Sequence, residues 1–122
     1  MKSLLVGLGG ALGSAARVAV GDLVTARLGS RFPFGTLIIN ITGCFIIGTF
    51  MGWWSLLKIS EQVRWLVPVG FVGAYTTFST FAFETVSLCR DGAYGRAFLY
   101  VLLSNLVGFF GAWISFALVN RS

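Results

Sequence analysis

The residues able to do chemistry are few, and most of them lie inside apolar stretches. The chain has no His, and no Ser or Cys has a plausible basic partner, so acid–base and nucleophilic catalysis are not expected. Arg17 lies deep in one apolar stretch, where it could bind an anion, raise the local potential or pair with protein groups. Asn40 lies midway along another, in "GTLIINITG", where its amide can donate to an anion or bridge two helices. These groups favour a transport pathway over an enzyme active site.

A third apolar stretch, "VGFVGAYTTFSTFAFE", is crowded with small and hydroxyl residues. They are Gly70, Gly73, Thr76, Thr77, Ser79 and Thr80. Glycine weakens a helix, and Ser and Thr can satisfy the backbone groups that a break frees. A break would expose carbonyl oxygens suited to a monovalent cation and a helix N-terminus suited to an anion. The alternative is Ser/Thr-rich packing in an unbroken helix.

Aromatic and hydroxyl side chains could extend such a pathway. Phe78 and Phe81 are three residues apart and share a helix face, so their positive ring edges could line an anion path, although two packing phenylalanines are the alternative. Tyr100 and Ser104 are four apart on one face and could continue a polar track. Asn105 could instead bond a neighbouring helix.

The composition sets the environment of these residues. Of 122 residues, 57% are hydrophobic and 11% charged, against about 25% charged in a soluble domain. Mean hydropathy is +0.88. This excludes a soluble enzyme and a nucleic-acid-binding domain and predicts a single all-α membrane domain over 1–122. Because about 20 apolar residues cross a bilayer, four spans are expected. They cover Ser3–Thr25, Phe34–Leu57, Trp65–Leu88 and Ala97–Val119.

Small residues indicate close helix packing. Gly9 with Gly13, and Gly48 with Gly52, form two GxxxG pairs, which allow helix backbones to approach closely in lipid. Neither a disulfide framework nor a metal site built from His, Cys and acidic side chains is expected.

Positive charge is balanced between the two sides of the membrane. The N-terminus, the second loop and the C-terminus carry four basic residues, Lys2, Lys58, Arg64 and Arg121. The first and third loops also carry four, Arg27, Arg31, Arg90 and Arg96. Since the Lys/Arg bias normally sets orientation, this balance favours insertion in both directions and pairing of two opposed copies. Misplaced loop boundaries that hide a weak bias are the alternative.

Four short spans with "GGALGSAAR", "FGTLIINITG" and "GAYTTFSTFAFE" in this order resemble the Fluc (CrcB) fluoride channels over essentially the whole chain. The resemblance implies a break in the third helix and an antiparallel, dual-topology homodimer in the bacterial inner membrane. It implies passive export of cytoplasmic fluoride through two pores. It also implies a central structural sodium ion, bound by the backbone carbonyls of Gly73 and Thr76.

The resemblance also implies which side chains line the pore. The matching residues are Asn40 as the pore asparagine, Phe78 and Phe81 as the pore phenylalanines, Ser79 and Thr80 as track hydroxyls, Tyr100 and Ser104 less firmly as further hydroxyls, Glu84 as the track's acid, and Arg17 as an electrostatic or structural contributor near the vestibule. "GAYTT" departs from the expected pattern, because Ala74 and Tyr75 fall in the break.

Two other functions fit four short spans. A small dual-topology multidrug exporter would want an acid deep in the membrane, whereas Asp22 lies near the end of the first span. A non-transporting subunit of a larger complex would explain the glycines but leave Arg17, Asn40 and the hydroxyl row without a use.

Overall fold

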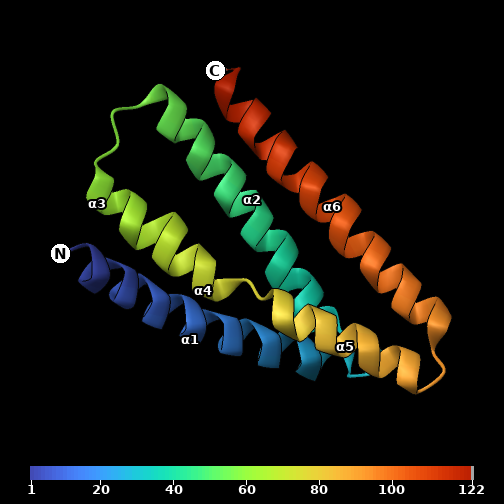
Figure 1. Ribbon diagram of the computed structural model, residues 1–122. Helices are drawn as coiled ribbons and strands as arrows, with labels where there is room; N and C mark the ends of the chain where they lie inside the picture. The colour runs from blue at the N-terminus through green and yellow to red at the C-terminus, as the bar shows by residue number, and fades with distance from the viewer. Residues whose placement is uncertain (122) are drawn as a thin grey trace.

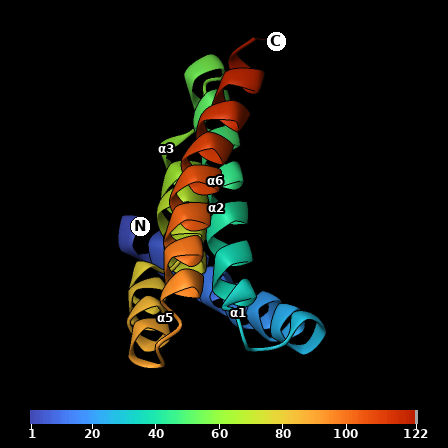
Figure 2. The same ribbon diagram turned by 90° about the vertical axis from the view of Figure 1, so that its right-hand side faces the viewer.

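The computed structural model describes residues 1–121, and every regular element within them is helical. The elements are α1 (Lys2–Leu28), α2 (Phe34–Leu56), α3 (Glu61–Arg64), η1 (Trp65–Val72), α4 (Gly73–Tyr75), α5 (Phe78–Arg90) and α6 (Tyr94–Asn120). Helices α2 and α6 lie side by side and run in the same direction, while α1 packs along η1 and α4 (Figure 1). Figure 2 shows that α1 crosses α2 and α6 obliquely.

Four stretches are long and apolar enough to cross a membrane, which confirms the predicted four spans. They cover 2–28, 34–56, 61–90 and 94–120. Three of them extend beyond the predicted bounds, because helical hydrogen bonding continues past the apolar run into polar end turns. Arg27, for example, lies in the last turn of α1, where a cation is favoured by the helix dipole. The second span ends one residue earlier than predicted, at Leu56.

The third span is assembled from several short pieces. Pro68 lies inside η1, where it cannot donate a backbone hydrogen bond, and the turns around it are π-helical. After α4, the backbone is extended at Thr76, with ψ 156°, and at Thr77, with φ −148° and ψ 113°. Helix α5 then begins at Phe78. Thr76 and Thr77 therefore separate two helical segments of one span.

Glycines of both predicted GxxxG pairs lie at close helix contacts. A Cβ atom on Gly9 or Gly13 of α1 would collide with the carbonyl oxygens of Leu66 and Phe71 in η1. On α2, a Cβ on Gly48 would collide with the Ala112 carbonyl and the Ser115 hydroxyl of α6. Such close approach increases van der Waals contact between the helices. In lipid this contact drives helix association, because the hydrophobic effect provides no driving force there.

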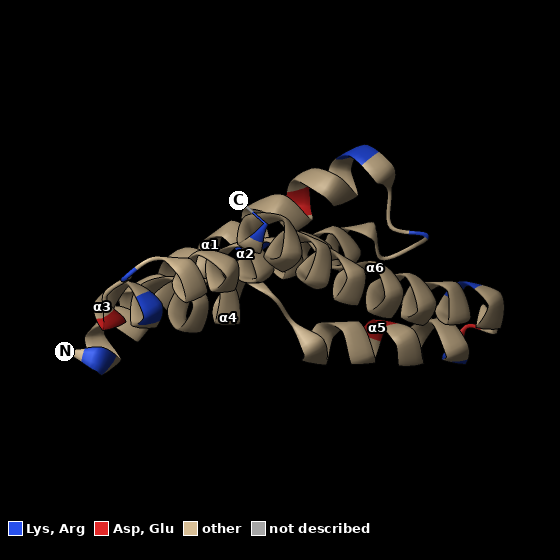
Figure 3. Cartoon of the chain, turned by 90° about the horizontal axis from the view of Figure 1, so that it is seen from above, with Lys and Arg blue, Asp and Glu red and all other residues tan. Residues whose placement is uncertain are grey.

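Most charged residues lie toward the two ends of the bundle (Figure 3), whereas Arg17 and Glu84 lie within spans. The α1–α2 and α5–α6 connections lie at the end away from both termini (Figure 1). Each end therefore receives the four basic residues that the loop count assigns to it. Both cysteines, Cys44 and Cys89, are free.

We expect Gly48→Ala to lower the free energy of unfolding by roughly 1–3 kcal/mol, the usual cost of overpacking. The added methyl group has no space against Ala112 and Ser115, so α2 and α6 must separate. Gly95→Ala is the matched control, since a Cβ there meets nothing within 4 Å. Thermal unfolding of both variants in detergent measures the difference, and equal melting of the two variants would contradict the packing role of Gly48.

Candidate functional site

Asn40 holds the segment between α4 and α5. Its Nδ2 donates to the Thr77 carbonyl oxygen at 3.1 Å, and the Thr77 backbone N–H donates to Asn40 Oδ1 at 2.8 Å. One side chain on α2 thus satisfies both backbone groups of an extended residue. Because an amide nitrogen has two N–H groups, Asn40 keeps a second donor for another acceptor.

Thr77 also caps the N-terminus of α5. Its Oγ1 accepts from the Thr80 N–H at 3.3 Å and donates to Thr80 Oγ1 at 3.0 Å, while Ser79 Oγ lies 3.4 Å away. The Thr80 hydroxyl is thereby engaged, and Ser79 is exposed. This cap was not predicted, although a threonine immediately before a helix is a recognisable N-cap signal.

Phe78 and Phe81 lie together on α5. Their ring centroids are 5.8 Å apart at 52°. Phe78 is 79% exposed, whereas Phe81 is half-buried and meets the Tyr100 ring edge-on at 5.0 Å and 65°. The two rings therefore connect the open start of α5 to the interior of the bundle.

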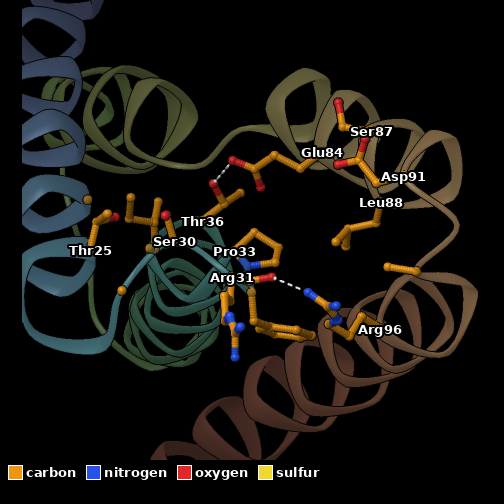
Figure 4. A pocket seen from close by; sticks show the side chains of 16 residues that line it. Thr25, Ser30, Arg31, Pro33, Thr36, Glu84, Ser87, Leu88, Asp91 and Arg96 are labelled. Carbon is orange, nitrogen blue, oxygen red and sulfur yellow. Dashed lines mark hydrogen bonds between the residues drawn. The ribbon is translucent and has the colours of Figure 1, made fainter.

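A hydroxyl–carboxylate chain follows these rings. Thr36 Oγ1 donates to Glu84 Oε1 at 2.8 Å, and the Tyr100 hydroxyl donates to Glu84 Oε2 at 2.7 Å. Tyr100 is fully buried. Figure 4 shows the Glu84 side chain pointing at Thr36. No signal in the sequence links Thr36 to Glu84, which lies 48 residues later.

A cavity of about 660 Å³ opens beside Glu84 at the end of the bundle away from the termini. Its polar lining comes from α1, α2, α5, α6 and the two connections, namely Thr25, Ser30, Arg31, Thr36, Glu84, Ser87, Asp91 and Arg96. The Arg96 guanidinium donates to the Arg31 carbonyl at 3.1 Å, which fastens the α1–α2 connection to the start of α6 (Figure 4). The cavity gives the Thr36–Glu84–Tyr100 chain an outlet between charged side chains.

Ser104 and Asn105 differ in their surroundings. Ser104 Oγ is buried without a hydrogen-bond partner among residues 1–121, one turn beyond Tyr100. Asn105 instead donates to the Val101 carbonyl of its own helix at 2.8 Å, and within residues 1–121 its side chain makes no hydrogen bond to a neighbouring helix. A buried hydroxyl without a partner is uncommon and calls for a reason.

Arg17 lies outside this row of side chains. It is half-buried on α1, one turn from Gly13, which packs on Phe71, and one turn from Gly21, which packs on Ile39. It lines neither the cavity beside Glu84 nor the groove at Gly73 and Thr76. Its place on the packing face of α1 is compatible with the structural role that the sequence left open.

Gly73 and Thr76 line a second, shallower groove of about 390 Å³, together with Asn40, Gly43 and Phe78. In a continuous helix the Thr77 and Thr80 N–H groups would bond the carbonyls of Gly73 and Thr76. Here they donate to Asn40 Oδ1 and Thr77 Oγ1. This arrangement diverts the usual helical donors from those two carbonyl oxygens.

Tyr75 is accommodated by packing. Its buried ring stacks on Phe71 at 5.8 Å and 12°, and its hydroxyl lies 2.9 Å from Thr42 Oγ1. The Thr42 hydroxyl donates to the Ile38 carbonyl at 2.7 Å, so the Tyr75 hydroxyl is the donor in this pair. Thr42 and Asn40, two residues apart on α2, therefore hold both ends of the Tyr75–Thr77 segment.

Comparisons with known proteins agree with this architecture. Residues 4–116 match the family described as "CrcB-like protein, Camphor Resistance (CrcB)". A protein of Acidobacterium capsulatum named "Fluoride-specific ion channel FluC" is 46% identical over 99% of this chain and 98% of its own length. Proteins with the same name from Solibacter usitatus and Thermus thermophilus are each 41% identical, over 99% and 96% of this chain and 100% and 94% of their own lengths. With its four apolar spans and this full-length similarity, the chain belongs to the CrcB family.

Proposed function

We propose that this chain is a fluoride-selective channel that lets fluoride leave the cytoplasm passively. The observation that carries the proposal is the continuous row from Phe78 and Phe81 through Tyr100 to Glu84, which ends at a cavity. The relatives' shared name supports fluoride as the ion. The chain is a multi-pass protein of the bacterial inner membrane and not an enzyme.

The chemistry of the row suits a small, strongly hydrated anion. Positive ring edges and O–H and N–H donors can replace its water without the deep trap that a full positive charge would create. Asn40 keeps one N–H, and Ser104 keeps a hydroxyl with no protein partner among the described residues. A passing anion would accept a hydrogen bond from the Ser104 hydroxyl, which otherwise bears the cost of burial without a partner. Thr36 and Tyr100 donate to Glu84, which organises their hydroxyls within the row.

The proposed working unit is an antiparallel homodimer with two pores. The equal count of basic residues at the two ends supports dual topology. Phe78 is 79% exposed beside the groove at Gly73 and Thr76, and non-helical backbone in a bilayer needs protein or a water-filled cavity around it. We assign the extended residues Thr76 and Thr77 as the break that the family resemblance implies, covered by the second copy.

A structural sodium ion is proposed at the dimer axis. The donor set fits, because sodium prefers oxygen ligands and the usual helical donors to the Gly73 and Thr76 carbonyls bond elsewhere. A two-fold axis through the groove would supply both carbonyls twice. The ion would supply positive charge that offsets the repulsion among these carbonyl oxygens.

The rival exporter lacks its main requirement. A coupled exporter of cationic drugs needs an acid deep in the membrane, and Asp22 in the first span is exposed within the last two turns of α1. Glu84, the acid that does lie inside the bundle, is already bonded by two hydroxyls.

Liposomes containing the purified chain should release fluoride rapidly and retain chloride.

Phe78→Ile and Phe81→Ile should each slow fluoride release about fivefold, since a ring-edge contact is worth about 1 kcal/mol. Asn40→Asp should slow it too, because a carboxylate cannot donate to an anion or to the Thr77 carbonyl. Phe83→Ile, an exposed position two residues from Phe81, is the control. Wild-type rates in all three variants would remove the pore assignment, and proton-coupled drug uptake would favour the exporter.

Sodium should stabilise the protein. At about 100 times its dissociation constant, sodium should raise the free energy of unfolding by about 2.7 kcal/mol. Thermal unfolding in sodium and in N-methylglucamine at equal ionic strength measures this, because the organic cation cannot fit between carbonyl groups. Identical melting curves in the two salts would contradict the sodium site.

A reporter fused to the C-terminus should be active on both sides of the membrane. Arg27→Gln combined with Arg31→Gln leaves two basic residues at the end with the α1–α2 and α5–α6 connections and four at the end with the termini. Because the more basic end stays in the cytoplasm, the same reporter should then be active mainly on the cytoplasmic side. Lys58→Gln combined with Arg31→Gln keeps three against three and serves as the control. Activity on one side only in the unmodified chain would refute dual topology.

A further inference from the structure

Two cations and two indole rings meet at the end of the bundle that holds both termini. Lys2 Nζ lies 4.0 Å from the centre of the Trp65 ring. Arg64 Cζ lies 5.5 Å from the same ring centre and 5.7 Å from that of Trp54. The four residues come from α1, α2, α3 and η1, so separate elements converge here. We call these residues the cation–indole cluster.

From the ends of the spans, we expect the cluster to lie at the depth of lipid headgroups. Trp54 is two residues before the end of α2, and Trp65 begins η1, where the third span enters the apolar region. Tryptophan is enriched at this level because one part of its ring is apolar and its N–H is polar. Both rings are half-buried, while Lys2 and Arg64 are exposed. The rings are therefore held by the protein, and the charged groups remain accessible from the membrane surface.

Ring contact leaves hydrogen-bond donors free. A guanidinium placed over an aromatic face keeps the N–H groups at its planar edge, and an ammonium keeps those that point away from the ring. Lys2 Nζ and Arg64 Cζ lie 4.0 Å and 5.5 Å from the centre of the same Trp65 ring, so two positive charges are concentrated around one indole. Lys58 adds positive charge at this end and Glu61 removes some, so the balance remains positive.

The opposite end is organised differently, although it has the same number of basic residues. All three cation–ring contacts within residues 1–121 belong to the cation–indole cluster. At the other end, Arg96 is committed to the Arg31 carbonyl. The two ends therefore have equal numbers of basic residues but different surfaces. Among the described residues, only the end with the termini holds cations against indole rings.

We propose that the cation–indole cluster is a binding site for the phosphate of an anionic phospholipid. Zwitterionic headgroups are disfavoured, because they bring a cation of their own to rings that Lys2 and Arg64 already cover. A glycerol headgroup carries no cation, so the negative charge of its phosphate is presented without this conflict. The proposal does not depend on fluoride conduction, so either can fail without the other.

Native mass spectrometry of the full chain in detergent tests the proposal. Phosphatidylglycerol and phosphatidylcholine with identical acyl chains are offered in turn. The wild type should retain phosphatidylglycerol preferentially, and Lys2→Gln with Arg64→Gln should reduce that retention roughly 25-fold, since each cation near an anionic surface contributes about fivefold. Arg27→Gln with Arg90→Gln, at exposed positions of the opposite end, should retain the lipid as the wild type does.

Three results would overturn the proposal. One is wild-type retention by the Lys2/Arg64 variant, and another is an equal loss in the Arg27/Arg90 variant. The third is complete displacement of the lipid by millimolar glycerol phosphate, which would make a soluble phosphate the ligand. In the unmodified protein, the preference for phosphatidylglycerol must also weaken as salt rises, because exposed charges are screened. This last measurement needs no variant to fold.

Discussion

The structure depends on how one extended segment meets its backbone hydrogen bonds inside a membrane. The hydrocarbon core offers no water, so every N–H and C=O freed at Thr76 and Thr77 needs a partner from the protein. Asn40 supplies two of these bonds and Thr77 itself supplies the cap of α5. The start of α5 sets the direction of Phe78 and Phe81 and the position of Glu84. The candidate pathway therefore follows from a single amide side chain on α2.

The four spans could be predicted from the sequence because hydropathy is a local property and a bilayer has a fixed thickness. The GxxxG pairs could be interpreted for a similar reason, since small residues at helical spacing mark a surface for close approach. Helix ends were less predictable. Polar end turns of α1 and α6 continue beyond the apolar run, and hydropathy does not report backbone hydrogen bonding.

The partners within the candidate site could not be predicted from spacing. Thr36 and Glu84 are 48 residues apart, and their hydrogen bond depends on how α2 and α5 are rotated about their axes. The same holds for Tyr75 and Thr42, where an unexpected tyrosine is explained by one hydroxyl acceptor on the facing helix. Sequence indicated which side chains are costly in lipid, and three-dimensional packing decided which of them meet.

The buried hydroxyl of Ser104 has a consequence of its own. With no partner among the described residues, no protein hydrogen bond fixes the direction of its O–H bond. A group that turns its hydrogen toward an anion and then turns away behaves like a single water molecule fixed to a helix. It would provide local polarisability in an otherwise low-dielectric interior. Dehydration of a passing ion would then be gradual, because the protein would respond to the ion's field as liquid does.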